Sequence, residues 1–278
     1  MKGRWKMMAL TRENLMSELE KKNFDVEAKD IVKNGVTCHG IEIKKTDGDI
    51  APIIYTDDLF SDANKKGYGM DSVVRMVTDF VISFGKDDKK NFNVKLLYDR
   101  NWVLNHLYIS AQRDSNQPYV KKKSICKGIE VFLYLNISRD GDEYGSINDV
   151  TEILRITGIT EAEAWKQAEK NMRDDMVIED MGTMLGLDLE EPMLYVLTNK
   201  VHMRGAGMIA DPTILADFAR IHNTHCIAVF PSSVHEVLLF PDAEMEDFSA
   251  YSMVVQSVNE ACVDEKERLS DRAYVFYL

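Results

Sequence analysis

The sequence is poor in cysteine, and its cysteines form no recognisable pattern. The 278 residues contain four of them, Cys38, Cys126, Cys226 and Cys262, which lie far apart and form no Cys-x-x-Cys pair. This spacing excludes the paired-cysteine motifs of zinc and redox sites. Three of the four stand within apolar periods, where free cysteine behaves as a small buried hydrophobe. We therefore expect a reducing compartment.

Long apolar runs are also missing. No run approaches the ~20 apolar residues that a membrane-spanning helix needs. The basic N-terminal residues are followed at once by Thr11-Arg12-Glu13-Asn14, where a signal peptide would have an apolar core. We expect a soluble, cytoplasmic protein without a membrane partner.

Complete catalytic and nucleotide-binding motifs are absent. Gly205-Ala206-Gly207 is followed neither by the Lys-Ser/Thr of a P-loop nor by the spacing of a dinucleotide fingerprint. We expect these glycines to mark close packing of two layers. There is no Gly-x-Ser-x-Gly elbow of a serine hydrolase. Leu239 stands where a zinc-binding helix would place a second histidine after His235. Asp140-Gly141-Asp142 lacks the closing glutamate of a calcium loop. No cofactor or metal is predicted.

Charge is present in quantity and is unevenly distributed. The formal net charge is −12; residues 1–125 hold 22 Lys and Arg against 18 Asp and Glu, whereas residues 126–278 hold 12 against 28. The acidic half is unsuited to direct nucleic-acid binding, which needs clustered Lys and Arg. Its acidic clusters serve either solubility or recognition of a protein with a basic surface. The candidate binding residues are Asp174, Asp175, Glu179, Asp180, Asp188, Glu190 and Glu191.

Two apolar runs separated by Pro231-Ser232-Ser233 predict the central element of the fold. Residues 226–230 and 234–240 are rich in aliphatic and aromatic side chains, the pattern of a hairpin deep in a sheet. In the second run, Val234, Leu238 and Phe240 fall on one face, and Val237 and Leu239 fall on the other. We expect this strand to be covered on both sides.

The remaining pattern predicts an α+β protein with two lobes, each a mostly antiparallel or mixed sheet with helices packed on one side. The N-terminal hairpin-plus-helix lobe, residues 1–115, is expected to contain a hairpin turning at Asp47-Gly48. The acidic C-terminal α+β lobe comprises residues 116–278. The first lobe's other expected elements are strands at 36–44, 50–55 and 93–98, a polar loop at 61–69 and a helix at 71–84; the second lobe's are strands at 129–137, 193–197, 203–209 and 273–277 and helices from Thr160, at 172–185 and from Asp211-Pro212.

Several motifs together resemble an uncharacterised bacterial family, a domain of unknown function common in anaerobic gut bacteria. They are Met193-Leu194-Tyr195-Val196-Leu197-Thr198-Asn199, Gly205-Ala206, Pro231-Ser232-Ser233-Val234-His235-Glu236-Val237, Leu269-Ser270-Asp271, Ile50-Ala51-Pro52-Ile53-Ile54-Tyr55 and Lys66-Gly67. The resemblance covers most of the chain from about residue 35. It implies no established activity; the similarity of family members to accessory cargo of mobile elements implies a host-interaction or counter-defence role.

Three functional hypotheses follow. The leading one is an acidic, non-catalytic interaction protein. The alternative is a small hydrolase using Ser232 or Ser233 with His235, although adjacent strand residues point to opposite faces and a turn serine need not meet the imidazole. The third is a sensor that binds a small molecule in a cleft between the lobes, lined by Trp102, Tyr108 and Tyr195.

Overall fold

The structure is a computed structural model that describes residues 8–44, 51–86, 92–138, 145–184, 186, 194–241 and 248–278. The chain divides into two compact units, Met1–Val94 (unit 1) and Lys95–Leu278 (unit 2). This division lies earlier than the expected boundary between residues 115 and 116. The reason is that β4 (Leu107–Arg113) pairs along its whole length with β6 (Ile129–Ser138), so residues 95–115 belong with the second unit.

Unit 1 is built on a three-stranded antiparallel sheet of order β1-β2-β3. Asn34 and Gly35, with φ of 49° and 82°, form the turn between the first two strands. Leu15 and Leu19 from α1 and a row of valines from α3 pack with Ile41 and Ile43 of β2. The elements of this unit are α1 (Arg12–Glu20), β1 (Asp25–Lys33), β2 (Val36–Lys44), β3 (Ile53–Tyr55), α2 (Thr56–Lys66) and α3 (Met70–Lys86).

The expected helix at 71–84 and strand at 36–44 are confirmed as α3 and β2. The polar loop expected at Ser61–Gly69 is wrong, because most of it is the second half of α2, which ends at Gly67 in the left-handed conformation. The expected elements also omit β1. The turn predicted at Asp47-Gly48 lies outside the described residues.

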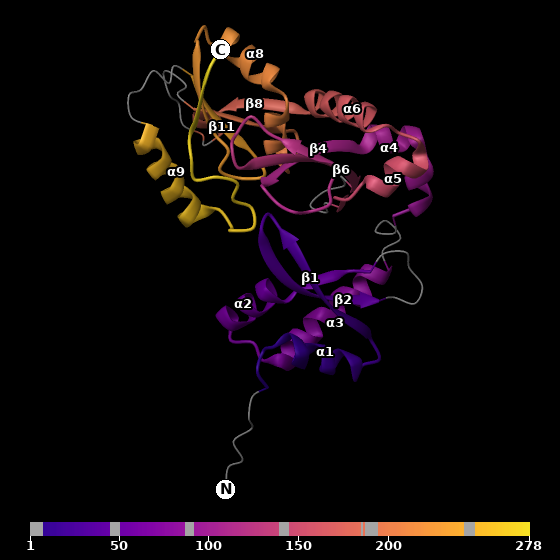
Figure 1. Ribbon diagram of the computed structural model, residues 1–278. Helices are drawn as coiled ribbons and strands as arrows, with labels where there is room; N and C mark the ends of the chain where they lie inside the picture. Colours follow the sequence, from indigo (N-terminus) through magenta and orange to yellow (C-terminus); the bar gives the residue numbers. More distant parts are fainter. Residues whose placement is uncertain are drawn as a thin grey trace. The chain divides into compact units, whose positions relative to one another are not determined.

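Unit 2 contains two antiparallel sheets. One has the order β4-β6-β5, with β7 also pairing β6; the other has five strands in the order β12-β10-β11-β9-β8. Together with the helices, they confirm the α+β class (Figure 1). The elements not yet bounded are η2 (Val94–Tyr98), α4 (Arg100–His106), β5 (Lys121–Lys123), β7 (Gly145–Ile147), α5 (Thr151–Thr157), α6 (Glu161–Asp174), β8 (Met176–Asp180), α7 (Met181–Met184), β9 (Tyr195–Asn199), η3 (Gly205–Ala210), α8 (Pro212–Ile221), β10 (Cys226–Phe230), β11 (Val237–Pro241), α9 (Phe248–Cys262) and β12 (Tyr274–Tyr277).

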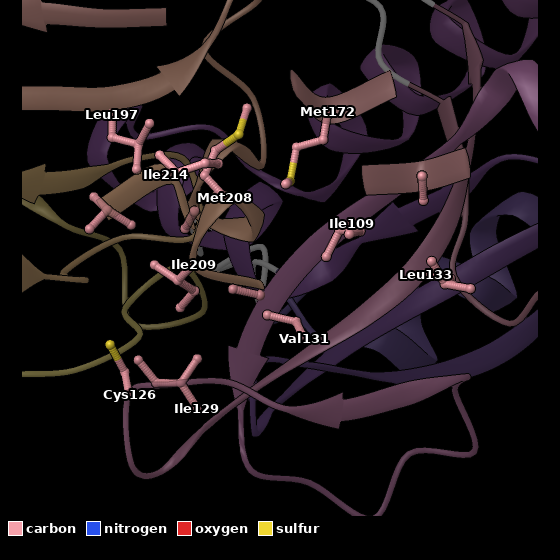
Figure 2. Packing of buried hydrophobic residues seen from close by; sticks show 14 of the residues in the cluster. Ile109, Cys126, Ile129, Val131, Leu133, Met172, Leu197, Met208, Ile209 and Ile214 are labelled. Carbon is pink, nitrogen blue, oxygen red and sulfur yellow. The ribbon is translucent and has the colours of Figure 1, made fainter. Parts of the chain in front are cut away.

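One apolar core joins the two sheets of unit 2. Ile109 and Leu133 from the first sheet share it with Leu197 from the second, and η3 supplies Met208 and Ile209 from between them (Figure 2). A second cluster on the other face of the five-stranded sheet contains Cys226, Ala228 and Phe230 of β10 with Val255 of α9. Figure 1 shows α8 and α9 flanking this sheet.

The central hairpin is confirmed. β10 pairs antiparallel with β11, and these two strands lie inside the five-stranded sheet. Val237 and Leu239 are fully buried in the larger core, while Leu238 and Phe240 pack in the second cluster, so β11 contributes to both faces as predicted. Val234 departs from the expected alternation because the second strand begins only at Val237 and residues 231–236 form a buried loop.

Three other expectations for this part of the chain are wrong. Residues 94–98 form a 3-10 helix where a strand is expected at 93–98. The helix expected at 172–185 is interrupted, because α6 ends at Asp174 and β8 follows. The strand expected at 203–209 is η3. The close packing expected of its glycines is nevertheless present, since a Cβ on Gly207 would lie 2.0 Å from the carbonyl oxygen of Ile109.

Candidate functional site

The predicted acidic residues form three groups along the sequence: one just before β8, one at its end and one after it. Asp174 and Asp175 precede its first residue, and both lie beside lysines. The Lys170 ammonium donates to Asp174 Oδ2 over 2.7 Å, and Lys200 Nζ is 3.8 Å from Asp175 Oδ1 and donates to the Asp174 carbonyl over 2.8 Å. These two carboxylates are therefore partly neutralised within the chain.

Glu179 and Asp180 form the other end of β8. Glu179 is exposed, and no ion pair joins it to another described residue. Asp180 Oδ2 accepts hydrogen bonds from the Thr183 N–H at 2.7 Å and the Thr183 hydroxyl at 2.9 Å. These contacts, with a further one from the Gly182 N–H, hold the pKa of Asp180 below its ordinary value despite partial desolvation. The carboxylate is thus ionised at neutral pH, and its second oxygen, Oδ1, is buried and has no hydrogen-bond partner among the described residues.

The last three predicted acids, Asp188, Glu190 and Glu191, lie outside the described residues. The described chain on their C-terminal side begins beside Asp180. Tyr195 is the pairing partner of Asp180, and the Leu194 carbonyl accepts a hydrogen bond of 2.9 Å from the Met181 N–H. Strand β9 therefore begins next to the end of β8.

The net charge of the chain belongs to unit 2. Unit 1 contains 16 Lys and Arg and 16 Asp and Glu, whereas unit 2 contains 18 and 30. The five-stranded sheet itself has no lysine or arginine in any strand, and its only charged residues are Glu179 and Asp180. Two exposed apolar side chains belong to neighbouring elements: Met184 follows the pair in α7, and Ile221 precedes His222, whose ring lies 4.5 Å from that of Tyr195, the pairing partner of Asp180. We call Glu179, Asp180, Met184 and Ile221 the acidic end of the sheet.

The serines of the central hairpin serve the loop between its strands. Both are buried. Ser233 Oγ accepts a hydrogen bond of 3.0 Å from the backbone N–H of His235, and the Ser232 carbonyl accepts one of 2.9 Å from the Leu269 N–H. The Val234 N–H donates to the Glu267 carbonyl at 2.8 Å. The loop is therefore fastened to the segment that follows α9.

The imidazole of His235 contacts neither serine hydroxyl among its described interactions. Its Nδ1 accepts a hydrogen bond of 3.3 Å from the backbone N–H of Arg204, so Nε2 carries the proton of the neutral ring, 3.5 Å from Glu267 Oε1. The neighbouring Glu236 has its pKa raised, chiefly by burial, although a hydrogen bond from Ser233 and the nearby His235 oppose the rise. The arrangement ties two loops together and forms no serine–histidine pair.

Sequence reasoning missed Arg204 as the residue that organises this region. It has a left-handed backbone conformation with φ of 58°, which is uncommon for a residue other than glycine. Its guanidinium lies 4.7 Å from the ring centre of Tyr134 and donates to Asn148 Oδ1 at 2.8 Å. These partners are distant in sequence, so no local pattern identifies the contact.

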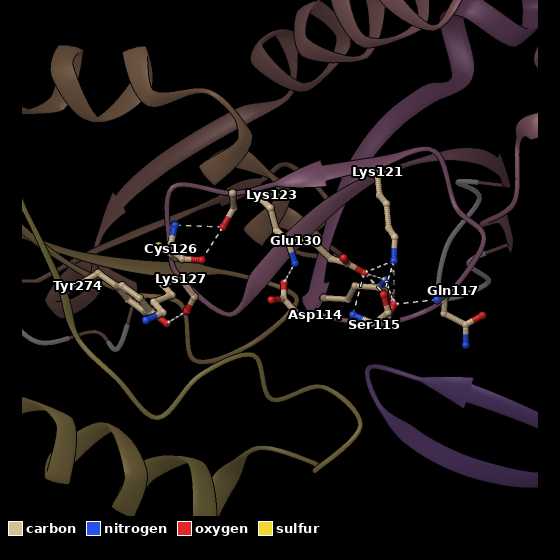
Figure 3. Close-up of polar contacts among 11 residues, drawn as sticks. Asp114, Ser115, Gln117, Lys121, Lys123, Cys126, Lys127, Glu130 and Tyr274 are labelled. Atoms are coloured by element: carbon tan, nitrogen blue, oxygen red, sulfur yellow. Dashed lines mark hydrogen bonds and ion pairs between the residues drawn. The ribbon is translucent and has the colours of Figure 1, made fainter.

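A second buried polar group proves to be architectural. Glu130, which is 2% exposed, accepts hydrogen bonds at Oε1 from Gln112 Nε2 and Ser115 Oγ, both at 2.7 Å, and from Lys121 Nζ at 3.0 Å (Figure 3). Burial raises the pKa of Glu130, but these donors outweigh it and leave the pKa below the ordinary value. The cluster holds the 114–120 loop against the sheet. Cys126, close by, has its pKa raised to about 12 by burial, which keeps its thiol protonated.

The aromatic residues proposed to line a cleft between lobes all belong to unit 2 and have separate surroundings. Trp102 stacks on His106 with ring centres 3.9 Å apart, and Tyr108 lies 6.1 Å from Tyr134. Tyr195 packs against Phe218 at 5.2 Å and against His222. The described contacts do not bring the three together.

The described ranges contain no group of three His, Cys, Asp or Glu side chains placed to hold a metal ion. No helix in the same ranges is long and apolar enough to cross a membrane.

Comparison with known proteins places this α+β chain in a family. The chain belongs to the Family of unknown function (DUF5688), whose family model matches residues 7–277. The expected resemblance to an uncharacterised domain family is thereby confirmed. No curated protein and no solved structure gives a significant match.

Proposed function

We propose that this protein is a non-catalytic cytoplasmic interaction protein that recognises a partner with a basic surface through the acidic end of the five-stranded sheet. The observation that carries the proposal is the composition of this sheet: its strands contain no lysine or arginine, and Glu179 and Asp180 stand together where β8 ends. Neither carboxylate forms an ion pair with another described residue, and Glu179 is exposed and therefore available to cations from outside.

The surroundings of these carboxylates support the same role. Exposed Met184, in the helix that directly follows these charges, provides apolar area, and interfaces combine an apolar centre with a polar rim. The excess of 12 acidic groups in unit 2 would attract a basic partner over a distance set by salt, about 8–10 Å at physiological ionic strength.

The described contacts favour this role over the hydrolase alternative. The His235 ring is engaged by the Arg204 N–H and the Glu267 carboxylate, and the Ser233 hydroxyl by the backbone of the same loop. A hydrolase that used Ser233 and His235 would first have to break these internal hydrogen bonds. Glu179, in contrast, is already exposed. The counter-defence role stays a prediction.

Charge reversal tests the proposal. Glu179→Lys in the full chain is compared with Glu260→Lys, which reverses another exposed carboxylate of unit 2 and changes the net charge equally. We expect proteins captured by the wild type and by Glu260→Lys from lysate of the native cell to be lost with Glu179→Lys, and to be lost from all baits at high salt. An identical set of captured proteins for all three baits would overturn the proposal.

A further inference from the structure

Strand β8 is an edge of the five-stranded sheet. Along it, residues whose backbone groups face β9 alternate with residues whose backbone groups face outward. The Lys200 N–H donates to the Asp175 carbonyl at 3.0 Å, and the Met181 N–H donates to the Leu194 carbonyl at 2.9 Å. Alternate residues of an antiparallel strand face the same neighbour, so residues 175, 177, 179 and 181 bond to β9. The N–H and C=O groups of Met176 and Ile178 therefore point away from β9. No hydrogen bond joins these four groups to another described residue.

Within the part of the chain that the structure describes, this edge shows none of the features that normally block strand addition. Proteins protect edges with lysines, prolines, bulges or a covering element. β8 contains no lysine or proline, and its register with β9 is unbroken from Met176 to Asp180. One edge strand of unit 1, β1, is protected because it carries Lys29 and Lys33 along nine residues. An open, unprotected edge is the surface on which an extended peptide can pair through its backbone.

Charge identifies the occupant. Residues 174–180 contain Asp174, Asp175, Glu179 and Asp180 and no basic residue. Pairing with β8 of a second copy would bring these acids against one another, and like charges on adjacent strands are destabilising. A strand with lysine or arginine would instead meet the exposed carboxylate of Glu179.

We propose that β8 accepts an extended basic segment of a partner protein as a sixth strand of the sheet. The inference rests on the proposed function and specifies its mode: backbone hydrogen bonds to Met176 and Ile178 provide the pairing, and the acidic end selects basic sequences. Glu179 and Asp180 point to opposite faces of the sheet, so lysine or arginine side chains at alternate positions of the incoming strand would lie on one face, beside the exposed Glu179.

Synthetic peptides separate backbone pairing from charge. The probe is a fluorescein-labelled heptapeptide of alternating lysine and valine, titrated with the full chain at low salt and followed by fluorescence anisotropy. A second peptide of identical charge has N-methylvaline at each valine, and a third has N-methyllysine at each lysine. Methylation in the phase that faces β8 removes the donors and blocks approach, so we expect one of these two peptides to bind roughly tenfold or more weakly than the parent. The other should retain binding.

Amide hydrogen exchange locates the peptide. We expect the parent peptide to slow exchange at Met176 and Ile178, with β1 of unit 1 unaffected as the internal control. Absence of binding by the parent peptide, or equal binding of all three peptides without protection of β8, would overturn strand addition. If that equal binding is lost in Glu179→Lys but not in Glu260→Lys, the acidic recognition surface stands and only its mode fails. Equal binding to both variants as well would overturn the proposed function.

Discussion

The three-stranded sheet of unit 1 and the five-stranded sheet of unit 2 differ in whether their acidic residues are paired with basic residues of the same sheet. The three-stranded sheet of unit 1 carries cross-strand ion pairs on β1 and β2, with Lys44 Nζ 2.7 Å from Glu27 Oε2 and Lys29 Nζ 3.6 Å from Glu42 Oε2. The five-stranded sheet of unit 2 has two acids and no base. In unit 1 the charges complement one another on adjacent strands. In the five-stranded sheet of unit 2, the described strands supply no base to complement the two acids.

The cores differ in the same direction. The apolar cluster of unit 1 gathers one face of its sheet against α1, α2 and α3, and strand β1 is largely exposed. In unit 2 every residue of β10 is buried, because both faces of that sheet are covered. Buried polar groups, such as Glu130 and the loop at Ser233, are correspondingly frequent there. Substitutions should therefore be costlier in unit 2, and paired variants test this.

The largest difference is expected between two glycines. A Cβ at Gly207 in unit 2 would lie 2.0 Å from a backbone oxygen of Ile109, whereas the nearest atom to one at Gly40 in unit 1 is Ile53 Cγ2, at 2.9 Å. Gly207→Ala forces the backbone apart and should lower the free energy of unfolding by about 3 kcal/mol or more, beyond the usual cost of overpacking. Gly40→Ala should cost less because a side-chain methyl group moves more easily.

Urea unfolding measures the effect at Gly207. Trp102 and Trp165 both lie in unit 2, so in a Trp5→Phe background tryptophan fluorescence reports that unit alone. Hydrogen exchange of β2 reports Gly40→Ala. Equal losses for the two variants would refute the contrast in packing.

A smaller effect is expected from two glutamates. Glu130→Ala leaves the side chains of Gln112, Ser115 and Lys121 without their shared acceptor in a buried place, and should cost about 3 kcal/mol. Glu27→Ala in unit 1 removes an exposed partner of Lys44 and should leave the unfolding midpoint nearly unchanged. Both are followed by urea unfolding, the first through tryptophan fluorescence and the second through circular dichroism. A Glu130→Ala variant as stable as the wild type would show that the cluster is not structural.

Sequence patterns found the elements whose signals are local. The apolar runs around Pro231 predict the central hairpin, and Thr160 with Glu163 predicts the start of α6, where the Thr160 hydroxyl accepts from the Glu163 N–H at 3.3 Å. β1 was not predicted because its many charged residues resemble those of a polar connecting segment. The Asn34-Gly35 turn was available as a signal for it, since this dipeptide favours the positive φ values of a tight hairpin.

The wrong secondary-structure predictions in unit 2 are explained by contacts between residues that are distant in sequence. Val177-Ile178-Glu179 follows a helix, and its pairing with β9 decides that it is a strand. η3 stands where a strand is expected, and its Gly207 packs against the carbonyl of Ile109, a contact nearly 100 residues away in sequence. The acidic residues were identifiable from composition, but which of them meet lysines depends on the β8–β9 register, as the contact of Asp175 with Lys200 shows.

The smallest expected effect is the pH dependence that Glu130 gives to unit 2. Its hydrogen-bond donors keep the folded-state pKa below the ordinary value near ~4.3, so the folded state binds its proton less readily than the unfolded state does. The resulting stability is complete above pH ~4.3 and is lost as the pH falls through the folded-state pKa, by about 1.4 kcal/mol for each unit of difference. The Glu130→Gln side chain cannot ionise, so the difference in unfolding free energy between wild type and variant should shrink between pH 5 and pH 3. Asp180 and Asp211 also have lowered pKa values, but they contribute equally to both proteins. Urea titrations of the tryptophan fluorescence across this range measure the difference. Parallel curves would mean that the Glu130 carboxylate is no better stabilised in the folded protein than in water, and the contrast between the exposed charges of unit 1 and the buried charge of unit 2 would disappear.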